Sequence, residues 1–286
     1  MGESLSGNGW TPVALSTDLP NGGVMRAYVD TIDMALWRGH SGRVHAWNNR
    51  CPHRGMRLSF GFVRGDRLSC LYHGWQYGED TACRHIPAHP DLEPPQSICA
   101  TAYYCAEADG LIWVSTTSDD ASAITPYGGS AIRSIAINAP ADRIQSLLMI
   151  GGFPVSVPVS DAIASTPAHY QCLASEGRRL VVEGRAGGVK TTLVASLHEL
   201  APDRTMVHLQ SLPEASPVRK TSLSRWAERM RWHAENLGAE NLGNDPESRQ
   251  PAIDTPATET LAAETLATET LATEANTALP FPEQTP

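Results

Sequence analysis

The chain has 286 residues, of which 41% are hydrophobic, and a formal net charge of −9 at pH 7. This length can bury one or two hydrophobic cores, and no run approaches the roughly 20 apolar residues of a membrane-spanning helix. The N-terminal residues lack the basic start and apolar core of a secretory signal, so the cytoplasm is the expected compartment. Six irregularly spaced cysteines do not form a disulfide framework, and their thiols are expected to stay reduced.

The negative charge is concentrated at the C-terminal end. Residues 235–286 hold ten acidic side chains and one basic side chain, whereas the rest of the chain holds 21 of each. The expected folded part is therefore close to neutral, and no nucleic-acid-binding surface is indicated.

Residues 1–116 are predicted to form an antiparallel β-domain. Short alternating or β-rich runs are separated by turn residues, and they lie at 34–38, 44–49, 100–106 and 111–115. Runs of this length, broken by glycine-containing turns, are typical of hairpin-connected strands.

Two loops of this domain each carry one cysteine and one histidine. NRCPHRGMRL at 49–58 contains Cys51 and His53, and SCLYHGWQY at 69–77 contains Cys70 and His73. Zinc fingers usually group two cysteines on one knuckle and two histidines on a helix, whereas each loop here mixes the two types. The pattern suits a two-iron cluster in which one iron takes both thiolates and the other takes both imidazoles. We therefore expect one [2Fe-2S] cluster per chain, with Cys51 and Cys70 on one iron and His53 and His73 on the other.

These loops, together with IPAHP at 86–90 and YYCAEADGLIWV at 103–114, resemble the Rieske domain of Rieske non-heme iron ring-hydroxylating and demethylating oxygenases. The resemblance covers about residues 10–116. Respiratory Rieske proteins carry a further disulfide cysteine in each ligand loop, and Met56 and Tyr72 occupy those positions here. The resemblance implies a flavin or ferredoxin reductase as electron donor, an oxygenase or other redox protein as acceptor, and a homo-oligomer, usually a trimer. Arg54, at the tip of the first loop, is a candidate for tuning the cluster or contacting a partner, but a solvated side chain is expected at such a position.

A linker at 117–131, rich in turn-forming residues, is predicted to lead into a smaller second domain at 132–240. Its sheet is expected from alternating or β-branched runs at 133–137, 146–150, 179–184, 191–197 and 205–212. Apolar residues at helical spacing predict one amphipathic helix over 222–237, with Ser222 as N-cap and its Trp and Met in the core. The fold class is therefore mainly β with some α (α+β).

Residues 241–286 are predicted to be a disordered acidic tail. They include the repeat ATETLAAETLATETLATEA, in which leucine recurs every five residues. On a helix this spacing turns each leucine by about 140° from the last and builds no apolar stripe.

The resembling family binds a mononuclear Fe(II) in its second domain through two histidines on a helix and a later carboxylate. No such motif is present here, so this iron is not supported by the sequence. His198 and His208 lie in strand-like runs, and His169 follows a proline that disfavours a continuous helix. The trio of His85, His89 and Asp91 is interpreted as part of a structural loop, and no catalytic residue is identified.

Three functions are compatible with this pattern. The first is a Rieske electron carrier that takes single electrons from a reductase and passes them to an acceptor. The second is a shortened terminal oxygenase that hydroxylates or oxidatively demethylates a small organic substrate at an iron held by atypical ligands such as His169, His198 or His208. The third is a regulatory or structural subunit whose cluster senses redox state. We expect the first, and the sequence indicates no particular substrate.

Overall fold

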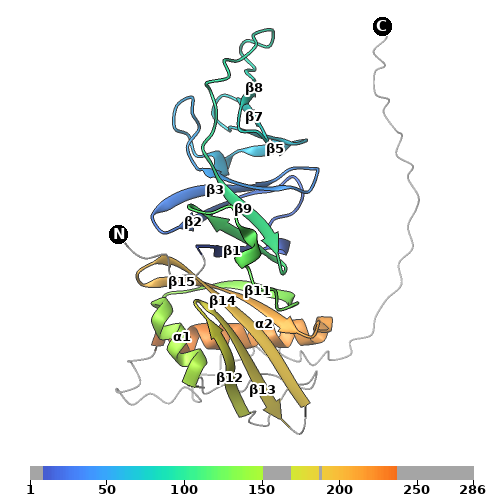
Figure 1. The fold of residues 1–286 in the computed structure, drawn as a ribbon, viewed down its shortest axis with the longest axis vertical. Helices are drawn as coiled ribbons and strands as arrows, with labels where there is room; N and C mark the ends of the chain where they lie inside the picture. Colours follow the sequence, from blue (N-terminus) through green and yellow to red (C-terminus); the bar gives the residue numbers. More distant parts are fainter. Residues whose placement is uncertain (1–8, 151–168, 187–188, 237–286) are drawn as a thin grey trace, which may run out of the picture. The chain divides into compact units, whose positions relative to one another are not determined.

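The computed structural model describes residues 9–150, 169–186 and 189–236, which form three antiparallel sheets and two α-helices (Figure 1). The predicted fold class, mainly β with some α, is confirmed. The predicted acidic tail at 241–286 lies outside the described residues. Neither described helix is long and apolar enough to cross a membrane.

The first sheet has six strands in the order β1-β10-β9-β4-β3-β2. Its strands are β1 (Thr11–Leu15), β2 (Val24–Val29), β3 (Ile32–Arg38), β4 (Val44–Asn48), β9 (Ala102–Ala108) and β10 (Leu111–Ser115). Consecutive strands β2, β3 and β4 pair as neighbours, as expected for runs separated by short turns.

The second sheet has four strands of three residues each, in the order β5-β6-β7-β8. They are β5 (Phe62–Arg64), β6 (Arg67–Ser69), β7 (Gln76–Gly78) and β8 (Cys83–His85). The segment between β4 and β5 contains the first predicted ligand loop, and the turn between β6 and β7 contains the second. The predicted N-terminal β-domain thus places both loops around one small sheet.

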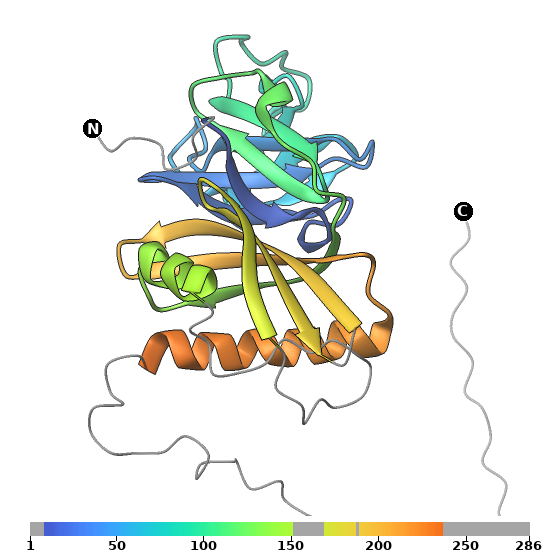
Figure 2. The same cartoon turned by 60° about the horizontal axis from the view of Figure 1, so that its bottom comes forward.

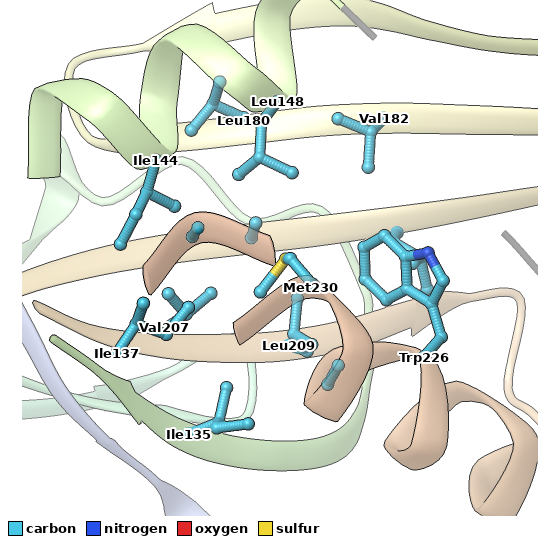
Figure 3. Close-up of a cluster of buried hydrophobic side chains, with 14 of the residues drawn as sticks. Ile135, Ile137, Ile144, Leu148, Leu180, Val182, Val207, Leu209, Trp226 and Met230 are labelled. Carbon is cyan, nitrogen blue, oxygen red and sulfur yellow. The ribbon is translucent and has the colours of Figure 1, made fainter. Parts of the chain in front are cut away.

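The third sheet has five strands in the order β11-β15-β14-β13-β12. They are β11 (Ser130–Ile137), β12 (His169–Glu176), β13 (Arg179–Ala186), β14 (Val189–Ala201) and β15 (Arg204–Leu212). The helices are α1 (Ala141–Ile150) and α2 (Pro217–Asn236), and α2 runs along the sheet (Figure 2). Every second residue of β13 and β15 faces one core, where Leu180, Val182, Val207 and Leu209 meet side chains of both helices (Figure 3).

The run at 146–150, predicted as a strand, is the second half of helix α1. Ile144, Leu147 and Leu148 follow helical spacing and are buried, whereas Ser146 and Met149 are exposed. Pro140 directly precedes the helix, where its missing N–H costs nothing, and leucine and methionine are good helix formers. The prediction of a single helix in this part of the chain was therefore wrong.

The second helix begins at Pro217, five residues before the predicted N-cap. The Arg219 N–H donates to the Ser216 side chain at 3.3 Å, so Ser216 caps the helix and Pro217 occupies the first turn. The Ser222 hydroxyl instead donates to the Val218 carbonyl within the helix. The predicted apolar face is confirmed, because Leu223, Trp226, Ala227, Met230 and Ala234 are all buried.

A buried ion pair links the third sheet to the turn between β9 and β10. The Arg179 guanidinium lies 2.7 Å from the Asp109 carboxylate, and their side chains are 6% and 1% exposed. The same guanidinium lies over the rings of Trp113 and Tyr127, at 5.1 and 4.4 Å from their centroids. Asp109 also accepts hydrogen bonds from the backbone N–H groups of Tyr127 and Gly128.

Candidate metal centre

The two predicted ligand loops have the same backbone hydrogen bonds. In each loop the cysteine N–H donates to the carbonyl five residues later, at 2.8 Å for Cys51 and 2.9 Å for Cys70. The glycine four residues after each cysteine donates back to that cysteine's carbonyl. Gly55 and Gly74 adopt φ of +73° and +69°, a left-handed conformation that glycine takes without steric cost. The chain thus builds one loop geometry twice, and each copy presents a thiol and an imidazole.

The two thiols lie buried beneath the loops. Cys51 and Cys70 are 4% and 2% exposed, and they share a hydrophobic cluster with Trp37, Trp47 and Leu58. A hydrogen bond from the Cys70 thiol lowers the pKa of the Cys51 thiol to about 5. The same hydrogen bond and burial raise the pKa of Cys70. At neutral pH the pair therefore holds one thiolate and one thiol, and a thiolate is the form that binds metal.

The two imidazoles lie above the thiols, nearer to the surface. The Nδ1 atoms of His53 and His73 are 3.2 Å apart, so the rings present the same nitrogen to one point. The His53 ring stacks on Trp75 at 4.0 Å between centroids, and His73 stacks on Tyr72 at 3.8 Å. Each imidazole is therefore held in orientation by an aromatic neighbour, and His73 remains exposed.

The four side chains fit a two-iron cluster better than a single metal ion. Two nitrogens bound at about 2.1 Å to one tetrahedral metal lie about 3.4 Å apart, close to the Nδ1 separation here. Within the described ranges, no three or more His, Cys, Asp or Glu side chains gather as they would around one ion. In a histidine-ligated [2Fe-2S] cluster each iron takes only two protein ligands, which corresponds to one thiol pair and one imidazole pair.

Tyr77 on β7 contacts the thiol pair. Its alternation with Trp75 on a strand predicts packing beneath the ligand loop, but the contact of its hydroxyl with a thiol was not predicted. Its hydroxyl lies 3.1 Å from the Cys51 sulfur, and the side chain is fully buried. Burial raises the pKa of Tyr77, so the hydroxyl keeps its proton and donates to a thiolate. The only signal in the sequence is that a tyrosine follows the second loop on a strand.

A Tyr77→Phe variant is expected to keep its cluster and to have a lower reduction potential. Loss of one hydrogen bond to a ligand sulfur destabilises the reduced, more negative state by about 1 kcal/mol, or about 40 mV for one electron. The measurement is a redox titration followed by visible absorption. Tyr127→Phe, which removes a hydroxyl near Glu176, is the control and should leave the potential unchanged. Equal potentials for Tyr77→Phe and the unmodified chain would contradict the assigned contact.

The remaining candidate histidines lie elsewhere. His198 on β14 and His208 on β15 are strand residues, as predicted, and both are buried, with ring centroids 6.0 Å apart. His198 Nε2 lies 2.5 Å from the Tyr28 carbonyl oxygen, and His208 Nδ1 lies 2.8 Å from the Ser134 hydroxyl. Burial lowers the pKa of these imidazoles to about 4 and about 3, so both stay neutral.

His169 is the first residue of β12, and its side chain lies outside the described part of the structure. His85 ends β8 and is half-buried, whereas His89 and Asp91 are exposed. Within the part of the chain that the structure describes, this trio is not brought together around a metal position.

Comparison with known proteins identifies the N-terminal part. Residues 9–97 match the family model for the Rieske [2Fe-2S] domain. The oxidoreductase NdmD of Pseudomonas putida is 31% identical over 223 residues, which is 74% of this chain and 37% of that protein. The methylxanthine N1-demethylase NdmA of the same species is 41% identical over 86 residues, which is 30% of this chain and 24% of that protein. The sequence alignments thus span 37% and 24% of the lengths of these two relatives.

Solved structures with a similar fold extend the likeness beyond the Rieske domain. Dicamba monooxygenase bound to 3,6-dichlorosalicylic acid superposes with a TM-score of 0.65 at 16% identity, covering 87% of this chain and 92% of that one. A Pseudomonas putida NdmA mutant with theobromine gives 0.61 at 20% identity, covering 88% and 84%. At these identities the likeness establishes the fold. The matched family model shows that the chain contains a Rieske [2Fe-2S] domain at residues 9–97, and relatives such as NdmA confirm its resemblance to the Rieske non-heme iron oxygenases.

Proposed function

We propose that the chain is a Rieske-type electron-transfer protein of an oxygenase system. It takes single electrons from a flavin or ferredoxin reductase and passes them to a separate acceptor. The observation that carries this proposal is the layered site, with a buried thiol pair below and an imidazole pair at the surface. The alignment with NdmD, an oxidoreductase, runs past the Rieske domain and supports a redox role for this chain as well.

In this proposal Cys51 and Cys70 hold one iron, and His53 and His73 hold the other. A [2Fe-2S] cluster supplies one-electron redox chemistry when bound. Two neutral imidazoles leave the site less negative than two further thiolates would, which favours the uptake of an electron. The Tyr77 hydroxyl adds to this effect through its contact with the Cys51 sulfur.

The imidazole pair provides the route by which electrons enter and leave. The His73 side chain is exposed and His53 is half-buried, whereas both thiols are shielded by the hydrophobic cluster. A partner that docks over the two loops therefore comes closest to the histidines. The stacked rings of Tyr72 and Trp75 hold the imidazoles in place and exclude water from one face of each ring.

The second candidate is a terminal oxygenase that hydroxylates or demethylates a small organic substrate. The observation in its favour is the fold, which resembles dicamba monooxygenase and NdmA over most of their lengths. The surroundings of His198 and His208 count against it. One nitrogen of each ring bonds within the core and the other has no partner, but both rings are enclosed, and among the described residues no third His, Cys, Asp or Glu gathers with them. An iron that activates oxygen needs ligands that converge and leave coordination positions open.

The test is an iron count on the full chain after anaerobic reconstitution. We expect two irons per chain, a reduced form with the low average g-value of histidine-ligated clusters, and no product from aromatic or N-methylated substrates with a reductase alone. A His198→Ala/His208→Ala variant should bind the same amount of iron. A third iron that this variant loses, together with product formed by the unmodified chain, would establish the oxygenase instead.

A further inference from the structure

Two histidines lie side by side where the first and third sheets meet. His198 on β14 and His208 on β15 are 2% and 1% exposed, and their ring planes lie within 22° of each other. Each ring also reaches an element of the Rieske domain. His198 bonds to the Tyr28 carbonyl on β2, and His208 reaches Asp18, just after β1, through the Ser134 hydroxyl. The pair is therefore part of the contact between the Rieske domain and the third sheet.

The hydrogen bonds define the tautomer of each ring. A carbonyl only accepts, so His198 carries its hydrogen on Nε2 and donates to Tyr28. The Ser134 hydroxyl donates to the Asp18 carboxylate at 2.5 Å, so it accepts from the Nδ1–H of His208 at 2.8 Å. The remaining nitrogens, Nδ1 of His198 and Nε2 of His208, are buried and have no hydrogen-bond partner among the described residues. The surroundings thus suit two neutral rings.

Protonation of either ring would enclose a positive charge away from water, which is costly. With both rings protonated, two like charges would lie on rings whose centroids are 6.0 Å apart. Burial lowers the pKa of His198 to about 4, although the Tyr28 carbonyl acts in the opposite direction. Burial and the neighbouring His198 lower the pKa of His208 to about 3, against a smaller opposite effect of the Pro12 carbonyl.

Within the described part of the chain, neither imidazole has a carboxylate partner of its own. Asp18 reaches His208 through Ser134. Strand β1 carries no titratable side chain, and Asp30 in the turn after β2 and Arg204 at the start of β15 are exposed. Other charged side chains of β2, β11 and β14 are paired elsewhere, as Arg26–Asp33, Arg133–Glu228, Arg178–Glu199 and Lys190–Glu183.

We propose that His198 and His208 make the contact between the Rieske domain and the third sheet acid-sensitive, so that the contact opens as the imidazoles take up protons. Imidazoles exposed to water protonate near pH 6.5, whereas the enclosed pair resists protonation down to about pH 4 and 3. The opened form therefore binds more protons throughout this window, and the contact is strongest above pH 6.5 and weakens as the pH falls. This device is independent of the proposed electron-transfer function.

Between about pH 7.5 and about pH 5.5 the equilibrium constant for opening should rise about tenfold for each imidazole, or about 100-fold for the pair. The test is urea denaturation of the full chain, reconstituted with its cluster, at these two pH values. Visible absorption follows the Rieske domain, and far-ultraviolet circular dichroism follows α1 and α2, which pack on the third sheet. The two midpoints should coincide at the higher pH and separate at the lower pH, because the two parts then unfold independently.

A His198→Gln/His208→Asn variant keeps the two hydrogen bonds but does not titrate. The glutamine amide nitrogen takes the place of Nε2, and the asparagine amide nitrogen takes the place of Nδ1. The midpoints of this variant should stay together at both pH values. The matched control is His89→Gln, which replaces an exposed histidine of the Rieske domain and should behave as the unmodified chain does.

Nuclear magnetic resonance of the unmodified chain labelled with nitrogen-15 histidine examines the pair without any substitution. We expect the Nε2–H tautomer for His198, the Nδ1–H tautomer for His208, and two neutral rings at about pH 5.5. A protonated ring in the folded chain at this pH would overturn the proposal. Midpoints of the unmodified chain that stay together at the lower pH would also overturn it, as would midpoints that separate equally in the double variant.

Discussion

An Arg179→Met variant is expected to lose about 3–5 kcal/mol of the free energy of unfolding. The substitution keeps the length of the side chain but removes the positive charge that lies 2.7 Å from Asp109. Because the Asp109 side chain is only 1% exposed, its carboxylate would remain buried without its cationic partner. The two cation–π contacts with Trp113 and Tyr127 are lost as well. Urea denaturation followed by circular dichroism measures the change.

A double-mutant cycle with Asp109→Asn isolates the ion pair. Asp109 has φ of +55°, a conformation that asparagine tolerates, and the asparagine Oδ1 can still accept from one of the two backbone N–H groups, those of Tyr127 and Gly128, that the carboxylate binds. The double variant should be more stable than the sum of the single changes implies, by at least 1 kcal/mol. Arg143→Met, on the exposed side of α1, should cost less than about 0.5 kcal/mol. Additive effects of the two single changes would show that the pair contributes nothing specific.

Local features of the sequence were enough to predict most of the fold. Alternating or β-branched runs predicted β3, β4, β9 and β10 in the N-terminal part and β11, β13, β14 and β15 after it, whereas β1, β2 and β12 were not predicted. Helix α1 was missed because only residues 146–150 were considered. After Ser146 this segment is entirely apolar, so it shows neither the alternation of a strand nor the spacing of a helix. Ile144, one turn earlier, supplies the helical spacing once the window is widened.

The juxtaposition of the two ligand loops could also be predicted, because a fixed pattern of residues repeats at short range. Contacts that depend on the register of strands distant in the sequence could not be predicted. His208 pairs with Ser134 across β11 and β15, and His198 lies beside it only because β14 and β15 align as they do. The cavity beside the first ligand loop is a similar case, since Asp33 lines it from β3 and Tyr72 lines it from the second loop. From the sequence alone, a solvated Arg54 was preferred over one that tunes the cluster or contacts a partner.

A His73→Cys variant is expected to keep a cluster and to have a reduction potential lower by 100 mV or more, on the order of the gap between Rieske and all-cysteine clusters. The substitution replaces a neutral imidazole with a thiolate, and the added negative charge opposes the incoming electron. The effect should exceed that of Tyr77→Phe several-fold, because a full charge is added at the metal rather than one hydrogen bond removed. A redox titration monitored by electron paramagnetic resonance measures the potential and the g-values together.

The matched control is His85→Cys, which introduces a thiol at a half-buried histidine on β8. Its potential should equal that of the unmodified chain, because His85 is not one of the four proposed ligands. A second variant tests the other imidazole, because the Nδ1 atoms of His53 and His73 lie 3.2 Å apart and face the same position. His53→Cys should therefore lower the potential by a comparable amount. A potential that stays constant in both variants while the cluster is retained would show that the imidazoles are bonded to each other and not to iron.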